Sequence, residues 1–292
     1  MGSPMLVLAA ILSLFIGLSL GLLGGGGSIL TLPILVYVLH VEPKTAIAMS
    51  LFVVGVTSAS GVIAHARAGR VRVRTGLIFG LAGMAGAFAG GRVAQFIPAT
   101  ALLVAFALVM LTAAAAMMRG RRASSAAPPR EPSLARSLAI GVSVGVVAGL
   151  VGAGGGFLIV PALALFAGLA MPEAVGTSLL VIALQSFAGF AGHAGHVQLD
   201  WMLTAVITGA AIVGGLAGAR LARHVSPDAL RRGFAWLVLA MAVFLLGKQI
   251  PAAALSVALT YLPLFLVAAA LVLFVLLLVR LRAGAPKESR AR

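Results

Sequence analysis

Long apolar runs, separated by short segments rich in arginine, glycine or proline, dominate the sequence. They show no alternation of apolar and polar residues and are too long for the strands of a membrane barrel. Most are close to the roughly 20 residues with which an α-helix crosses a hydrocarbon core. The runs cover residues 5–23, 28–40, 46–64, 75–91, 100–118, 137–151, 157–170, 174–192, 201–219, 233–247 and 251–279. Because lipid offers no partner to backbone polar groups, each run predicts a helix, and the chain as a whole predicts an all-α, polytopic integral membrane protein.

The two halves of the chain repeat each other at an offset of 128 residues. The segment Gly21–Pro33, which holds four consecutive glycines, matches Gly149–Pro161, and the proline stands in the same place. Further identities at this offset pair Ser50 with Ser178, Ser58 with Ser186, Gly61 with Gly189, His65 with His193, Gly86 with Gly214, Gly90 with Gly218 and Arg92 with Arg220. A general excess of apolar residues would not align histidine and arginine in this way, so we interpret the pattern as a duplication.

Each half begins with a pair of runs broken by glycines and continues with three unambiguous spans. The predicted organisation is a first transmembrane repeat at 1–118, a polar and proline-rich linker at 119–136, and a second repeat at 137–247. Residues 248–292 follow as an additional span with a basic tail.

Composition narrows the class of protein further. With 62% hydrophobic and 9% charged residues, the chain differs from soluble domains, which are about one quarter charged. It contains no cysteine, which excludes disulfides, thiolate metal sites and cysteine nucleophiles. The 21 Lys and Arg residues far outnumber the 6 Asp and Glu residues. Because the arginines lie in short loops beside apolar runs, they indicate membrane topology rather than binding of nucleic acid.

The basic residues also predict how the halves are oriented. If each glycine-broken pair is one helix, the repeats are parallel, and Lys and Arg divide 10 against 11 between the two sides. If each pair is a hairpin, the repeats are inverted and 18 of the 21 lie on one side, leaving Lys44, Arg92 and Lys248 on the other. The positive-inside rule favours the hairpin, and with it inverted repeats, an extracytoplasmic N-terminus and a cytoplasmic C-terminus.

The glycine breaks are the first candidate site. Glycine allows close approach of the backbone, and the helix that follows offers unpaired amides and the positive end of its dipole to an anion. The alternative is close helix packing, for which glycine is common in membranes. On the first interpretation the binding residues are Gly25, Gly26, Gly154 and Gly155.

Hydroxyl and amide side chains inside apolar spans are the second candidate. Ser50, Ser58, Ser178, Ser186 and Gln185 occur with Thr57 and Thr177 inside otherwise apolar runs. Such groups suit a sulfur or phosphorus oxyanion, although single membrane serines commonly bond back to a carbonyl of their own helix. The predicted interior holds no Asp or Glu, because all six fall in loops or at helix ends, which favours an anionic substrate.

Arginine and histidine near the span ends have two interpretations each. Arg92 and Arg220 follow small-xxx-small pairs; they are placed to snorkel to the interface, and are second candidates for attracting an anion. His65 and His193 could carry a coupling proton or could be interfacial residues without a role. The spacing of His193, His196 and Asp200 is weak support for a metal, so we expect no metal, no catalytic residue and no cofactor.

The segments GGGGSILTLP ending at Pro33 and GAGGGFLIVP ending at Pro161, with the Ser50 and Ser178 segments behind them, resemble the TauE/SafE sulfite-exporter family, also called toluene sulfonate uptake permeases. The resemblance covers about residues 5–247. It implies a bacterial permease for sulfite, sulfoacetate or other sulfur-containing organic anions.

These observations together predict a secondary transporter for small sulfur-containing anions that works by alternating access in the bacterial inner membrane. The alternatives are a channel-like anion pathway, a membrane metalloenzyme and a purely structural scaffold. The expected partners are the anion and the lipid bilayer, with no nucleic acid, and the sequence is compatible with a homo-oligomer without deciding it.

Overall fold

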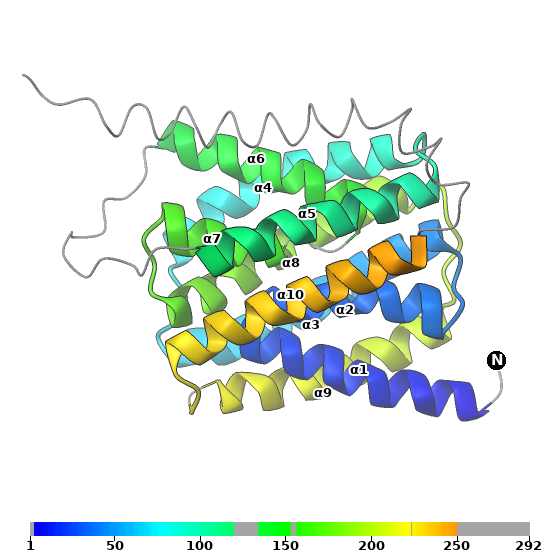
Figure 1. The fold of residues 1–292 in the computed structure, drawn as a ribbon, viewed down its shortest axis with the longest axis horizontal. Helices are drawn as coiled ribbons and strands as arrows, with labels where there is room; N and C mark the ends of the chain where they lie inside the picture. Colours follow the sequence, from blue (N-terminus) through cyan, green and yellow to red (C-terminus); the bar gives the residue numbers. More distant parts are fainter. Residues whose placement is uncertain (1–2, 120–133, 153–155, 223, 250–292) are drawn as a thin grey trace, which may run out of the picture.

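The computed structural model describes residues 3–119, 134–152, 156–222 and 224–249, and within these ranges the regular structure is helical throughout (Figure 1). The first half contains α1 (Ser3–Leu23), α2 (Gly26–Pro33), the π-helix η1 (Ile34–Val38), α3 (Pro43–Arg67), α4 (Val73–Ala94) and α5 (Ala99–Arg119). The second half contains α6 (Leu134–Val151), α7 (Gly156–Phe166), α8 (Met171–His193), α9 (Trp201–Leu221) and α10 (Pro227–Gln249). The predicted all-α class is confirmed, whereas most of the linker and the additional span lie outside the described residues.

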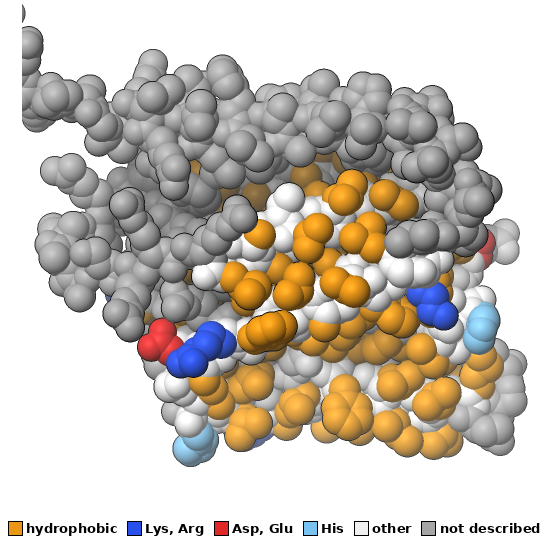
Figure 2. Space-filling view, viewed as in Figure 1, with side chains coloured by type: hydrophobic (Ala, Val, Ile, Leu, Met, Phe, Trp, Pro, Cys, Tyr) orange, Lys and Arg blue, Asp and Glu red, His pale blue; other side chains and the backbone are white. Residues whose placement is uncertain are grey.

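Six of the described helices are long and apolar enough to cross a membrane. They are Met5–Leu23, Pro43–Arg67, Val73–Ala94, Met171–His193, Trp201–Leu221 and Asp228–Lys248. Large hydrophobic side chains such as Phe15, Leu81 and Val213 are about 60% exposed. Figure 2 shows hydrophobic side chains across the middle of the visible face and charged ones near its two ends. This arrangement suits lipid around the middle and water at the ends, as expected of a multi-pass membrane protein.

Local sequence signals set several helix boundaries. Glu42 caps α3 by accepting a hydrogen bond from the Thr45 amide at 2.8 Å, and Pro43 follows in the first turn. Asp200 caps α9 by accepting from the Leu203 amide at 3.0 Å. Both carboxylates lie at helix N-termini, where the helix dipole favours negative charge. Two of the four described carboxylates therefore serve as caps at the ends of spans.

The helices pack in a pattern that stays the same when the two halves are exchanged. Helix α1 packs on α9, and its equivalent α6 packs on α4, which is the equivalent of α9. Helices α3 and α8 are equivalent and pack on each other, as do α5 and α10, and α2 and α7. The duplication in the sequence is therefore also a duplication in the packing.

Glycines allow the pairs α1–α9 and α4–α6 to approach closely. A Cβ atom at Gly214 or Gly218 would overlap the backbone carbonyl of Leu14 or Leu18. In the other pair, a Cβ atom at Gly86 or Gly90 would overlap the carbonyl of Val142 or Val146. The predicted small-xxx-small packing is confirmed in both halves.

The central pair, α3 and α8, runs antiparallel. Gly189 lies beside Leu51, Gly55 beside Ser186, and Gly61 beside Leu179, so residue numbers rise along one helix as they fall along the other. Interpolation along these contacts places residue 56 of α3 next to its own equivalent, residue 184 of α8. The pseudo-twofold axis that relates the halves therefore crosses the middle of this pair.

Candidate functional site

Both halves break where the glycine runs predict a break. Helix α1 ends at Leu23 and is followed by Gly24 with a φ of 69°, while α6 ends at Val151 and is followed by the equivalent Gly152 with a φ of 76°. This left-handed backbone is costly for any residue with a Cβ atom. The helices resume at Gly26 and Gly156. Two equivalent glycines therefore make the same turn.

The two breaks meet each other inside the molecule. A Cβ atom at Gly25 would overlap the carbonyl group of Gly156, so the start of α2 lies directly against the start of α7. No side chain caps the N-terminus of α2. Two positive dipole ends converge here, and an anion would stabilise an arrangement that is otherwise repulsive. Of the predicted glycines, the structure brings Gly25 and Gly26 to this point, while Gly154 and Gly155 lie outside the described residues.

Each break rests on the central helix of the opposite half. Ser178 Oγ is 2.7 Å from the position that a Cβ atom would take at Gly24, and Ile47 of α3 contacts Gly152 in the same way. The Ser178 hydroxyl donates to the carbonyl of Val175 at 2.8 Å. With its proton used in this bond, the hydroxyl can only accept a hydrogen bond from another group.

The helices α3 and α8 carry a set of buried polar groups with no hydrogen-bond partner in the described part of the chain. These groups are the hydroxyls of Ser50, Thr57, Ser58 and Ser186 and both amide atoms of Gln185. All five side chains are at most 2% exposed. A buried polar group without a partner costs about 1–3 kcal/mol, so several together on facing helices indicate a binding function.

The unpartnered groups follow the repeat. Thr57 is equivalent to Gln185, and Ser58 is equivalent to Ser186, and these four lie near the middle of the α3–α8 pair. Gln185 also lies against Gly83 of α4, and Thr57 lies against Gly215 of α9. The set therefore lines two equivalent surfaces on either side of the pseudo-twofold axis. The offset in the sequence points to Thr57 as the counterpart of Gln185.

The two predicted proton-coupling histidines are buried and make equivalent contacts. His65 Nε2 lies 3.1 Å from the carbonyl oxygen of Gly21, and His193 Nε2 lies 2.9 Å from that of Gly149. Because a carbonyl only accepts, Nε2 carries the proton in both rings. Gly21 and Gly149 belong to the last turns of α1 and α6, where carbonyls have no partner within the helix. The histidines therefore cap the helices that end at the glycine breaks.

The contact of His65 with Gly21 also gives the direction of the chain. It places the end of α3 beside the end of α1, so the intervening α2 and η1 carry the chain back to the end of the bundle where α1 began. The contact of His193 with Gly149 gives the same result for the second half. The leading pair in each half is thus a hairpin.

Arg92 and Arg220 lie away from the central hydroxyls. Both side chains are exposed at the C-terminal ends of α4 and α9, one contacting His196 at 3.3 Å and the other the Leu216 carbonyl at 3.5 Å. Their positions suit snorkelling to the interface.

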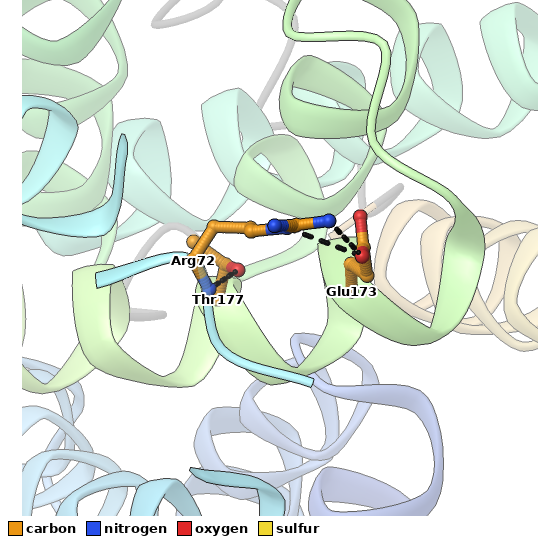
Figure 3. A network of polar contacts seen from close by, with 3 residues as sticks. All are labelled: Arg72, Glu173 and Thr177. Atoms are coloured by element: carbon orange, nitrogen blue, oxygen red, sulfur yellow. Dashed lines mark hydrogen bonds and ion pairs between the residues drawn. The ribbon is translucent and has the colours of Figure 1, made fainter. Parts of the chain in front are cut away.

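A polar network joins the halves at the end of the bundle where α3 ends and α8 begins (Figure 3). Arg72 forms an ion pair with Glu173 at 2.6 Å, and the Arg72 amide donates to the Thr177 hydroxyl at 2.9 Å. The hydrogen bond and the negative charge of Glu173 raise the pKa of Arg72 above its ordinary value. None of the described carboxylates is buried. The interior that the structure describes therefore offers donors and dipole ends without acidic groups.

Comparison with known proteins agrees with this architecture. Residues 9–245 match the family described as Sulfite exporter TauE/SafE. The chain belongs to this family. A probable membrane transporter protein of Xylella fastidiosa is 36% identical over 240 residues, which cover 80% of this chain and 92% of the relative. The probable membrane transporter protein YdhB of Bacillus subtilis is 27% identical over 244 residues, which cover 82% and 99%. No solved structure matches the chain significantly.

The family and its relatives indicate a membrane transporter rather than an enzyme. In the described residues, no group of three or more histidines and carboxylates is placed to hold a metal ion. Asp200, from the weak metal spacing, instead caps α9.

Proposed function

We propose that this TauE/SafE family member is a secondary transporter for small sulfur-containing anions such as sulfite, sulfoacetate or organosulfonates. The observation that carries the proposal is the meeting of the α2 and α7 N-termini at Gly25 and Gly156. Positive dipole ends converge there, beside helices whose buried hydroxyls have no partner among the residues that the structure describes. A tetrahedral or pyramidal oxyanion accepts several hydrogen bonds at once and suits such a set of donors.

The transport cycle that we propose is alternating access between two inverted repeats in the bacterial inner membrane, with the C-terminus in the cytoplasm. The antiparallel packing of the equivalent helices α3 and α8 supports this orientation, because an axis perpendicular to spanning helices lies in the membrane plane. Rocking one half against the other would expose the meeting point of the breaks first to one side and then to the other.

The serines near the axis provide the test. In proteoliposomes, the double change Ser58→Ala and Ser186→Ala should weaken sulfite uptake and binding by roughly tenfold or more, because two hydrogen bonds to a charged ligand are lost. Stability should stay constant or rise, because two unpartnered hydroxyls are removed. Uptake and binding of radiolabelled sulfite would measure the first effect, and thermal unfolding in detergent the second.

Ser13→Ala is the matched control. Ser13 is a buried membrane serine whose hydroxyl donates to the Ala9 carbonyl of its own helix at 2.6 Å, so its loss should leave uptake unchanged. Binding of neutral or cationic solutes in place of anions would contradict the proposal. Flux that neither saturates nor exchanges would replace alternating access by a channel.

A further inference from the structure

A polar pocket lies at the end of the bundle where α3 begins and α4 and α8 end. Its volume is about 280 Å³. It is lined by Lys44, Ala94, Gln95, His193, His196 and Val197. Three separate segments of the chain build it, and most of its polar residues have no place in the central site.

The charged groups of this pocket suit an anion. Lys44 Nζ donates to the Gln95 carbonyl at 2.9 Å, which uses one of the three ammonium donors. Arg92 lies behind the pocket, with its Nη1 3.3 Å from His196 Nε2. Because a guanidinium only donates, Nε2 of His196 accepts in this contact, which leaves Nδ1 as the ring nitrogen that can donate to a ligand. None of the lining residues is a carboxylate.

The residues that line this pocket are not all repeated in the other half of the sequence. At the equivalent positions of the opposite end, Pro172 replaces Lys44, Ala68 replaces His196, and His65 replaces His193. At that opposite end, the guanidinium of Arg72 is paired with the carboxylate of Glu173. The Lys44 and His196 donors are therefore particular to the end of the bundle that holds the pocket.

A second pocket, of about 290 Å³, adjoins the first at Val197. It is lined by Phe190, Ala194, Val197, Gln198, Leu199 and Trp201. Phe52 makes edge contacts with Phe190 and Trp201, at centroid distances of 5.4 and 5.6 Å, which fix both rings. An aromatic pocket with one amide suits a small apolar group.

We propose that the two pockets form one outer binding site for an organic oxyanion, separate from the central site. The anionic head lies between Lys44 and His196, and a short apolar group lies against Phe190 and Trp201. His193 lines the outer pocket and also contacts Gly149, just before the second glycine break, so the outer site is continuous with the element that forms the central one. This inference rests on the proposed function, since it supplies the place where the anion first binds.

The test uses two sulfonates with the same head and different tails. Full-length protein with Ser58→Ala and Ser186→Ala, in phosphatidylcholine nanodiscs, is titrated with methanesulfonate and butanesulfonate by calorimetry. These two changes weaken the central site, so the outer site gives a larger share of the binding signal. Adding Lys44→Gln or His196→Ala should weaken binding of both by roughly three- to tenfold, because the first change removes a partly solvated charge and the second removes an N–H donor to the anion. Trp201→Ala should weaken binding of butanesulfonate by a similar factor of about three to ten and leave methanesulfonate unchanged, because only the longer tail loses buried apolar area.

Lys248→Gln is the matched control. Lys248 is exposed, lies over the Phe244 ring at 6.0 Å, and does not line the pocket. The Phe244 ring also contacts Tyr37, which places Lys248 at the same end of the bundle as the pocket. Its loss should leave binding unchanged. Equal binding by the Lys44, His196 and Lys248 variants would overturn the outer site.

Two further outcomes separate this inference from the function it rests on. If the protein with both serines intact binds the sulfonates and the double serine variant binds none, the outer site is wrong and the proposed function stands. If neither protein binds an anion, both are wrong. The lipid that remains bound to the purified protein is also measured. If the pocket variants change only the amount of bound phosphatidylglycerol, the pocket holds a lipid and the outer site is also wrong.

Discussion

At the scale of single residues, the candidate binding groups are buried polar side chains that have no hydrogen-bond partner in the described part of the chain. The hydroxyls of Ser58 and Ser186 lie in the middle of an antiparallel helix pair without a described partner, where most membrane serines bond to their own helix. Ser13 and Ser143 show that usual arrangement in the same protein, each donating to a carbonyl four residues earlier. The contrast between these pairs, rather than the presence of serine, marks the candidate binding surface.

Gly24 offers a test of the break at the scale of one residue. With a φ of 69° and Ser178 Oγ 2.7 Å from its Cβ position, Gly24→Ala should lower the free energy of unfolding by about 1–3 kcal/mol and reduce transport. Thermal unfolding and sulfite uptake would measure the two effects. Gly209→Ala is the control, because this helical glycine has open space around its Cβ position, so stability should rise by about 0.5–1 kcal/mol. Normal transport by the Gly24 variant would contradict the role given to the break.

At the scale of elements, the proposed function depends on the ends of helices. Helices α1 and α6 end inside the molecule, and the carbonyls of their last turns receive histidine N–H groups from α3 and α8. The beginnings of α2 and α7 meet, and in the proposed function their amides bind the anion. In each broken hairpin the protein thus supplies partners for the end of the first helix, and the proposal assigns the beginning of the second helix to the anion.

The histidine caps can be separated from the predicted role in proton coupling. If capping dominates, His65→Phe and His193→Phe should each lower the free energy of unfolding by about 1–3 kcal/mol, because a buried carbonyl loses its donor. His→Gln, which keeps a donor, should recover part of that loss. Thermal unfolding measured beside the dependence of uptake on a proton gradient checks this. Variants of unchanged stability that lose only proton coupling would contradict the capping role.

The sequence predicts the helices better than it predicts the sites. The end of α1 at Leu23 and the end of α6 at Val151 agree with the predicted apolar runs, because glycine interrupts an otherwise continuous pattern. The π-helix η1 after Pro33 is not predicted, since a helix that continues past a residue without an N–H depends on its packing partners. The predicted end of the run 157–170 is wrong, because α7 already ends at Phe166. Gly168 follows with a φ of 66°, a backbone conformation that does not continue a helix.

The outer pocket could not be predicted from the sequence, because its residues are distant along the chain. Lys44, Gln95 and His196 come from three loops or helix ends, and only the tertiary packing brings them together. No local pattern marks them, and the repeat does not reveal them, because Pro172 is equivalent to Lys44 and Ala68 is equivalent to His196. The central hydroxyls could be predicted because they recur at the offset of the duplication.

At the scale of the whole molecule, the account depends on the orientation of the halves. Equivalent helices α3 and α8 pack antiparallel, and equivalent breaks meet between them, so both halves contribute to one site. If the halves are inverted in the membrane, the pseudo-twofold rotation that superposes one half on the other also exchanges the two sides of the membrane. The pocket near Lys44 and the ion pair of Arg72 with Glu173 are then the features that distinguish the two sides.

The most direct test of this claim is the accessibility of the loops after α3 and α8. The natural chain has no cysteine, so Ala68→Cys and Ala194→Cys each introduce a single thiol at an exposed position without background. With a membrane-impermeant maleimide applied to intact cells, and then to inverted vesicles, the inverted arrangement predicts that Cys at 194 is labelled from outside and Cys at 68 only from inside. Labelling of both positions from the same side would contradict it.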